Sequence, residues 1–191
     1  MQQNSLFLHL YMGKTEKELI TGCIKQDRRA QRELYEKYSP RMFPVCLRYI
    51  GDSEKAKDVL QEGFITLFTK IESYSGEGSF EGWMRRIFIN TALMQLRKND
   101  VLNNSEDITQ VQVGAAIDTD LIDTLDGKEV VKLISIMPIG FRTVFNLYII
   151  EGFSHQEISV KLNISEGASR SQLSRARIWL QERILKMEEE K

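Results

Sequence analysis

Residues 154–183 read SHQEISVKLNISEGASRSQLSRARIWLQER and predict two helices joined by a tight turn. Ser154 and Glu157 have the S-x-x-E spacing of a capping box, in which each residue satisfies an otherwise unpaired backbone amide of the first helical turn. Asn163 interrupts the helical pattern, and Ser165 can cap a second helix that begins immediately after it. The stretch therefore predicts a helical hairpin.

The second helix of this hairpin has two different sides. The predicted buried side consists of Ser169, Leu173, Ala176, Leu180 and Ile184. The opposite side contains Ser171, Ser174 and Arg175, flanked by Arg170 and Arg177. A small first helix followed by a helix with such an outer face is typical of a helix-turn-helix element that reads the major groove of DNA. The alternative interpretation is an ordinary amphipathic hairpin with a solvated basic face.

Charge is distributed unevenly along the 191 residues, although the formal net charge is only −1. Residues 99–129 hold eight acidic residues and one lysine, whereas residues 25–98 and 154–187 are mildly basic. The acidic stretch has no sustained hydrophobic period, which predicts a flexible linker. A hydrophobic fraction of 42% is sufficient for folded cores on both sides of it.

Several classes of protein are disfavoured by what the sequence lacks. The apolar run at residues 6–12 is too short to cross a membrane, so no stable membrane insertion is expected. Cys23 and Cys46 have no metal-ligand spacing and predict free thiols in the cytoplasm. Asp58 and Glu62 lie four residues apart, but the second ligand pair of a helical metal site is missing. No glycine-rich phosphate loop is present, so we predict no metal, no cofactor and no enzyme.

Hydrophobic periodicity and capping residues predict helices throughout. Thr15 and Asp27 mark the first two helix starts, Pro40 separates a third helix at residues 42–50, and Gly51 ends it. Further helices are expected at residues 54–72, 80–98, 127–136 and 139–151, before the hairpin. The predicted fold is all-α, with two small helical domains joined by a flexible acidic linker. Its segments are an N-terminal extension (1–14), a first domain (15–98), the linker (99–127), a helix-turn-helix domain (128–187) and a tail (188–191).

The helix expected at residues 54–72 has an apolar stripe and a separate polar side. The stripe comprises Leu60, Phe64, Leu67, Phe68 and Ile71, and the separate side comprises Asp58, Gln61, Glu62 and Ile65. A side left over after the core is covered is available for a partner.

The helix expected at residues 80–98 also has two sides. Phe80, Met84, Ile87, Phe88 and Thr91 are predicted to face the core, while Trp83, Arg86, Asn90 and Arg97 fall within about 60° of one another. An aromatic ring, two guanidinium groups and an amide on one stripe suit base stacking and phosphate binding. The alternative is that Trp83 belongs to the core and the arginines are only solvated.

Two blocks of motifs resemble the extracytoplasmic-function (ECF) group of bacterial RNA polymerase sigma factors, in the sigma-70 family. The first block is DVLQEGF (58–64) with FEGW (80–83) and the helix that carries Arg85, Arg86, Asn90 and Arg97, and it is similar to region 2 of the family. The second block is MPIGFRTVF (137–145), YIIEGFSHQEI (148–158) and NISEGASRSQLSRAR (163–177), and it is similar to region 4. Their order and separation are more specific than either block alone.

The resemblance implies a protein that is not an enzyme but lends promoter specificity to core RNA polymerase. It implies core polymerase binding through Asp58, Gln61, Glu62 and Ile65, and −10 DNA binding through Trp83, Arg86, Asn90 and Arg97. It places a flipped base in the loop at residues 73–79. It implies −35 DNA binding through Arg170, Ser171, Gln172, Ser174, Arg175 and Arg177, with Arg142 and His155 at most contacting the DNA backbone. The expected partners are core RNA polymerase, promoter DNA and an anti-sigma factor.

Three residues depart from the pattern of the family. Met94 stands where many relatives have aspartate, Ser169 where a buried valine is common, and Gln172 where a basic residue is common. The last two prevent a promoter sequence from being transferred from better-known members. A second hypothesis is a helix-turn-helix regulator that binds duplex DNA as a dimer without polymerase, with residues 15–98 as a sensing domain.

Overall fold

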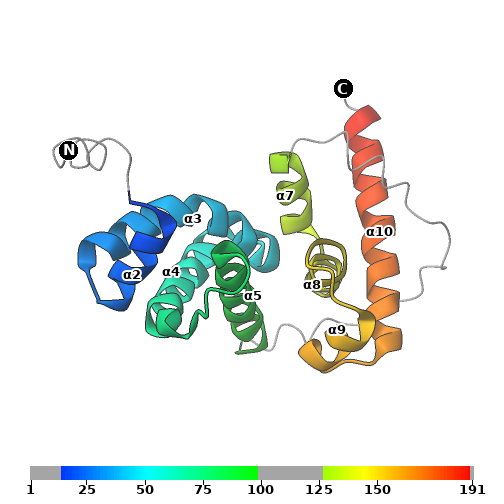
Figure 1. Cartoon of the computed structure of the whole chain (residues 1–191). Coiled ribbons are helices and arrows are strands. Elements are labelled where there is room, and N and C mark those ends of the chain that lie inside the picture. The colour runs from blue at the N-terminus through cyan, green and yellow to red at the C-terminus, as the bar shows by residue number, and fades with distance from the viewer. Residues whose placement is uncertain (1–13, 99–126, 190–191) are drawn as a thin grey trace.

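The computed structural model describes residues 14–98 and 127–189, and every regular element within these two ranges is a helix (Figure 1). The all-α fold and the two helical domains that the sequence predicts are therefore confirmed. The predicted acidic linker at residues 99–127 lies outside the described residues, except for Gly127, which begins a helix. The predicted N-terminal extension also lies outside them, except for Lys14.

The first domain is a bundle of four α-helices. They are α2 (Glu16–Ile24), α3 (Arg28–Ile50), α4 (Ser53–Lys70) and α5 (Phe80–Lys98), with a 3-10 turn η1 (Ile71–Ser73) after α4. Thr15 and Glu18 form a full capping box at the start of α2, and Asp27 and Asp52 cap the next two helices with their side chains. The sequence predicted the starts at Thr15 and Asp27 because capping residues are local signals.

Helix α3 differs from the prediction because it is one continuous helix through Pro40 and Pro44. The sequence predicted a break at Pro40, since a proline removes a backbone donor and costs about 3 kcal/mol inside a helix. Burial continues across both prolines. Tyr38 lies before Pro40, Met42 between the two prolines and Tyr49 after Pro44, and each of the three is exposed by 1% or less. Packing of this long stripe against α4 and α5 offsets the local cost.

Helices α4 and α5 approach each other closely at Gly63. A Cβ atom placed there would lie 2.4 Å from the Phe88 ring, so only glycine fits this crossing. The Phe88 ring packs edge-on against Phe64 at a centroid distance of 5.0 Å. This contact fixes the spacing of the two helices that carry the candidate functional residues of the first domain.

The second domain contains the predicted hairpin. Its elements are α7 (Gly127–Ile136), α8 (Ile139–Phe145), a π-helical turn η2 (Asn146–Ile150), α9 (His155–Leu162) and α10 (Glu166–Glu189). Ser154 and Glu157 form the predicted capping box, and Asn163 adopts a left-handed conformation with φ 56° that turns the chain into α10. The five residues predicted for the inner side of α10 are all buried: Ser169, Leu173, Ala176, Leu180 and Ile184.

The two domains meet at the C-terminal end of α3. Helices α7 and α8 lie between this end and α10, as Figure 1 shows. The side chain of Arg142 donates to the carbonyl of Ile50 at 2.9 Å, and that of Asn146 donates to the carbonyl of Arg48 at 2.9 Å. The last carbonyls of a helix have no partner within that helix. The second domain thus caps α3 from outside.

Candidate functional site

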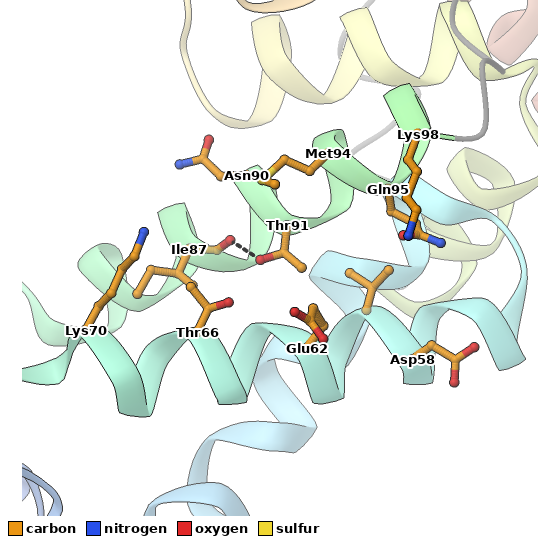
Figure 2. A pocket seen from close by; sticks show the side chains of 11 residues that line it. Asp58, Glu62, Thr66, Lys70, Ile87, Asn90, Thr91, Met94, Gln95 and Lys98 are labelled. Atoms are coloured by element: carbon orange, nitrogen blue, oxygen red, sulfur yellow. Dashed lines mark hydrogen bonds between the residues drawn. The ribbon is translucent and has the colours of Figure 1, made fainter.

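A groove of about 500 Å³ runs between α4 and α5 and is bordered by part of the predicted polymerase-binding side (Figure 2). Asp58 and Glu62 line it from α4, while Asn90 and Met94 line it from α5. Met94, the residue that departs from the family pattern, is 66% exposed at its edge. The groove combines two carboxylates and two lysines, Lys70 and Lys98, with apolar surface, which suits a protein partner.

The other two members of this side, Gln61 and Ile65, are exposed on α4 but do not line the groove. Ile65 is 54% exposed, as single apolar side chains on a protein surface often are. Ile87 and Thr91 were expected to face the core, but both line the groove and are only partly buried. The buried stripe of α5 is rotated toward Ile89, Ala92, Leu93 and Leu96, because α3 covers α5 as well as α4.

Trp83 lies at the edge of the core and beside the loop at residues 73–79. Its ring stacks on Phe80 at 5.7 Å and packs against Tyr74 at 5.4 Å. The Tyr74 hydroxyl donates to the carbonyl of Gly78 at 2.9 Å, which ties the loop to this aromatic cluster. A hollow of about 350 Å³ opens here, lined by Trp83, Arg86 and the loop. Trp83 thus packs on the core and also lines a hollow, and its contact with DNA stays a prediction.

The remaining residues of the predicted −10 stripe continue along α5. Arg86 and Asn90 are exposed and line a second cleft, of about 480 Å³, that also includes Phe153 and Lys161 of the second domain. Arg97 is exposed and donates to the backbone carbonyl of Lys161. The stripe therefore faces the second domain in this arrangement of the chain.

A cluster of ionic groups that the sequence did not bring together lies at the same domain junction. Glu151 accepts hydrogen bonds from Arg48 and, in a two-pronged contact at 2.9 and 3.0 Å, from Arg85. The side chains of Arg48 and Glu151 are 9% and 8% exposed, and that of Arg85 is 32% exposed. Burial and the charge of Arg85 lower the pKa of Arg48, while the hydrogen bond to Glu151 raises the pKa of Arg85.

Arg142 was expected at most to contact the DNA backbone, and this expectation is wrong for the arrangement seen here. It is 6% exposed and donates to the carbonyls of Ser135 and Ile50, at 2.5 and 2.9 Å. Burial lowers the pKa of Arg142 to about 10. Its position on an otherwise apolar helix is the one sequence signal that could have indicated burial.

Helix α10 presents most of the predicted −35 residues toward solvent. Arg170 is exposed and pairs with Glu166 at 2.7 Å, while Ser171, Ser174, Arg175 and Arg177 are partly exposed. Gln172 lies differently, because its carboxamide packs against Gly140 of α8. Its Oε1 atom is buried and has no hydrogen-bond partner within the described part of the chain. The six residues are therefore brought together on one helix but not on one face.

The buried Ser169, a second departure from the family pattern, has a local partner. The His155 Nδ1 atom lies 2.9 Å from the Ser169 hydroxyl, and the ring stacks on Tyr148 at a centroid distance of 4.5 Å. Burial, with the nearby positive charge of Arg170 as a second cause, lowers the pKa of His155. His155 thus joins α9 to α10, and a serine at position 169 supplies its partner.

The described ranges, 14–98 and 127–189, contain neither a metal-ligand cluster nor a membrane-spanning helix. No group of three or more histidine, cysteine, aspartate or glutamate side chains there is placed to hold a metal ion. Within the same residues, no helix is both long enough and apolar enough to span a membrane.

Comparison with known protein families finds two matches, in the order that the motifs predict. Residues 34–101 match the family described as sigma-70 region 2, and residues 128–180 match the family described as sigma-70, region 4. Together the matches cover more than half of the chain. They contain the groove, the aromatic hollow, the α5 stripe and the first part of α10.

Similar proteins with assigned names agree with these matches. The chain is 27% identical over 183 residues to the ECF RNA polymerase sigma-E factor of Haemophilus influenzae, covering 89% of this chain and 95% of that protein. It is 29% identical over 158 residues to the ECF RNA polymerase sigma factor SigE of Mycolicibacterium smegmatis, covering 81% of this chain and 61% of that protein. A solved structure of the sigma factor RpoE with the anti-sigma factor NepR, from Bartonella quintana, is 22% identical with a TM-score of 0.47, covering 81% of this chain and 96% of that chain. On the two family matches and the named relatives, the chain belongs to the ECF group of the sigma-70 family of RNA polymerase sigma factors.

Proposed function

We propose that this sigma factor binds core RNA polymerase through α4, opens the −10 element through α5, and reads the −35 element through α10. The observation that carries the proposal is the aromatic hollow beside Trp83, which continues into the exposed Arg86 and Asn90 of the same helix. A promoter strand needs both a place for an unstacked base and cations for its phosphates. The helix-turn-helix in the second domain supplies a separate contact for duplex DNA.

Core polymerase docks, in this proposal, on the exposed side of α4. Asp58, Gln61 and Glu62 are exposed there without serving the core of the domain, and Ile65 adds an apolar contact. Carboxylates at the rim of a small apolar patch favour a partner that offers arginine or lysine around an apolar centre. Substitution of Asp58 and Glu62 should therefore weaken polymerase binding without unfolding the chain.

The −10 element meets α5 and the neighbouring loop. Trp83 can stack on a base at the edge of the duplex, and the hollow beside it can hold one base that has left the stack. Unstacking costs a few kcal/mol, which contacts within the hollow must offset. Arg86, Asn90 and Arg97 then follow the strand, with the guanidinium groups on phosphates.

The −35 element receives α10 in its major groove. The proposed contacts are Arg170, Ser171, Ser174, Arg175 and Arg177, with Gln172 at the inner edge of the set. Arginine can bind either the two acceptors of a guanine or a phosphate. An experiment is therefore needed to assign each residue to a base or to the DNA backbone.

The proposal extends to the wider context of the chain. We expect a cytoplasmic protein without a catalytic activity of its own, held inactive by a protein of the anti-sigma class. Family membership supports this expectation. The groove between α4 and α5 also supports it, because an inhibitor can cover that surface. A helix-turn-helix regulator that works without polymerase is the disfavoured alternative.

Transcription by purified core polymerase tests the function directly. Core enzyme and this chain on genomic DNA should yield transcripts with defined starts, and core enzyme alone should not. Asp58→Asn with Glu62→Gln should abolish these starts, while Glu54→Gln, on an exposed part of the same helix, should preserve them. Tight binding of the chain alone to a palindromic duplex, with no initiation by core enzyme, would instead establish the regulator.

A further inference from the structure

The Arg48–Arg85–Glu151 cluster has the geometry of an anion site that is filled from within the chain. The two guanidinium groups come from the first domain, on α3 and α5, and the carboxylate comes from the second domain, just after η2. Arg85 meets the carboxylate with two parallel hydrogen bonds, at 2.9 and 3.0 Å. The same fork geometry binds a phosphate oxygen pair equally well.

The first domain alone cannot neutralise these two arginines. Besides Glu151, the charges that shift the pKa of Arg48 are those of Arg85, which is repulsive, and of Tyr49. Within the described residues, Glu81 is the only other carboxylate that raises the pKa of Arg85, and Glu81 already pairs with Arg41 at 2.7 Å. Two neighbouring cations without an adjacent anion favour whichever anion can reach them. If the second domain moves away, the pair is left exposed and uncompensated.

The location of the pair indicates which anion replaces Glu151. Arg85 precedes Arg86 on α5, and both line the 480 Å³ cleft that also contains Asn90. An extended strand that passes over Arg86 and Asn90 therefore runs beside Arg85. In the arrangement seen here the same cleft contains the carboxylate of Glu151, which occupies the hydrogen-bond donors of Arg85 that a phosphate would need.

The other contacts between the domains hold the chain in this closed form. Arg142 and Asn146 cap the carbonyls at the end of α3, and Arg97 is bound to the carbonyl of Lys161. Arg97 is a member of the −10 stripe, so the far end of the stripe is occupied by the second domain. Closure and DNA binding thus compete for the same face of α5.

We propose that Glu151 is an internal substitute for a DNA phosphate: it holds Arg48 and Arg85 in a closed chain, and a phosphate of the single-stranded promoter takes this site when the domains separate. The inference rests on the proposed function only for the identity of the strand. The closed form explains how one face of α5 stays covered until polymerase draws the two domains apart. Arg48 and Arg85 are binding residues in addition to the predicted stripe.

Glu151→Gln in the full-length chain tests the closed form, because it keeps the shape of the side chain and removes the charge. Small-angle X-ray scattering should give a larger radius of gyration than for the wild-type chain. Affinity of the free chain for a fluorescent oligothymidine should rise about tenfold at low salt, since a covered site reduces apparent affinity by its closed fraction. Glu54→Gln, which changes the net charge equally at an exposed ion pair, should change neither quantity.

The phosphate site itself is tested by adding Arg85→Gln to Glu151→Gln. The slope of log affinity against log salt concentration should fall by about 1, the value for one lost phosphate contact. An unchanged slope would overturn the phosphate site. Arg85→Gln alone provides a second way to open the chain. If both single variants keep the wild-type radius of gyration and a native circular dichroism spectrum, the closed form is overturned. Neither readout uses polymerase, so failure of initiation with core enzyme would count against the proposed function only.

Discussion

Arginines occupy two contrasting environments in this molecule. Arg86 and Arg170 lie on exposed helix faces, where Arg170 forms a solvent-exposed ion pair with Glu166. Arg48 and Arg142 are 7% and 6% exposed at the junction of the domains, where carbonyls and one carboxylate replace water. An exposed guanidinium contributes little to stability, whereas a buried one needs hydrogen-bond acceptors to be tolerated. Arg48 and Arg142 have such acceptors at their terminal nitrogens, but their Nε atoms have none within the described part of the chain. The difference separates arginines whose donors are available to a ligand from arginines whose donors the structure occupies in this arrangement.

The strongest test of this contrast is Arg142→Met. We expect a loss of about 3 kcal/mol in the free energy of unfolding, since the change leaves the carbonyls of Ser135 and Ile50 buried without their donor. Urea unfolding followed by circular dichroism measures it. Arg41→Met is the matched control, because Arg41 forms an exposed ion pair with Glu81 that should contribute less than about 1 kcal/mol. Equal losses for the two variants would contradict the contrast.

Arg86→Ala should show the opposite profile, with function lost and stability kept. We expect initiation by core polymerase to fall roughly 10- to 100-fold, the effect of losing one strong nucleic-acid contact of 1–3 kcal/mol. The unfolding midpoint should stay within about 0.5 kcal/mol of the wild-type value, as for other exposed positions. Arg41→Ala in the same domain should leave initiation unchanged. If initiation falls equally in that variant, the effect comes from the loss of any positive charge and not from the position of Arg86.

Gln172 lies between the two environments, so Gln172→Met sharpens the comparison. Removing a buried oxygen that has no partner within the described residues should stabilise the chain by about 1 kcal/mol. Promoter choice should stay the same if the carboxamide only packs against Gly140. Transcript starts mapped with the variant and core polymerase measure this second expectation. A changed set of promoters would show that Gln172 turns outward and reads a base.

Much of the fold is predictable from the sequence because its signals are local. Capping at Thr15 and Ser154, and the left-handed turn at Asn163, depend on neighbours within four residues. The buried side of α10 follows from helical spacing alone. The break expected at Pro40 is wrong because burial along α3 acts over the whole helix, beyond the range of a local signal.

The candidate site is predictable to a smaller extent. Spacing identified outward-facing residues on α4, α5 and α10, except that Trp83 packs partly on the core and Gln172 turns toward Gly140. It could not identify which residues meet across the domain junction. Arg48 and Glu151 are 103 positions apart in sequence, and nothing in the spacing of either one refers to the other. Arg142 was misassigned for the same reason, since a lone arginine on a helix is usually solvated. Pairing of distant charges depends on tertiary structure.

The smallest expected effect concerns His155, a group whose charge changes with pH within the helix-turn-helix. Its pKa is lowered by burial and by Arg170, with Arg177 adding to the effect and Glu166 opposing it. A lowered pKa in the folded state means that the neutral ring is favoured there. The stabilising contribution is therefore complete above the ordinary value of 6.5 and is lost as pH falls through the lower folded value.

His155→Gln should remove this pH dependence while keeping a hydrogen-bonding partner for Ser169. Melting temperatures measured at about pH 7.5 and about pH 5.5 should differ more for the wild-type chain than for the variant. Both chains carry the same carboxylates, so the difference between the two shifts isolates the imidazole. If the variant loses as much stability on acidification as the wild-type chain, the His155–Ser169 contact does not depend on a neutral ring. In that case His155 resembles the exposed arginines, which contribute little to the stability of the chain.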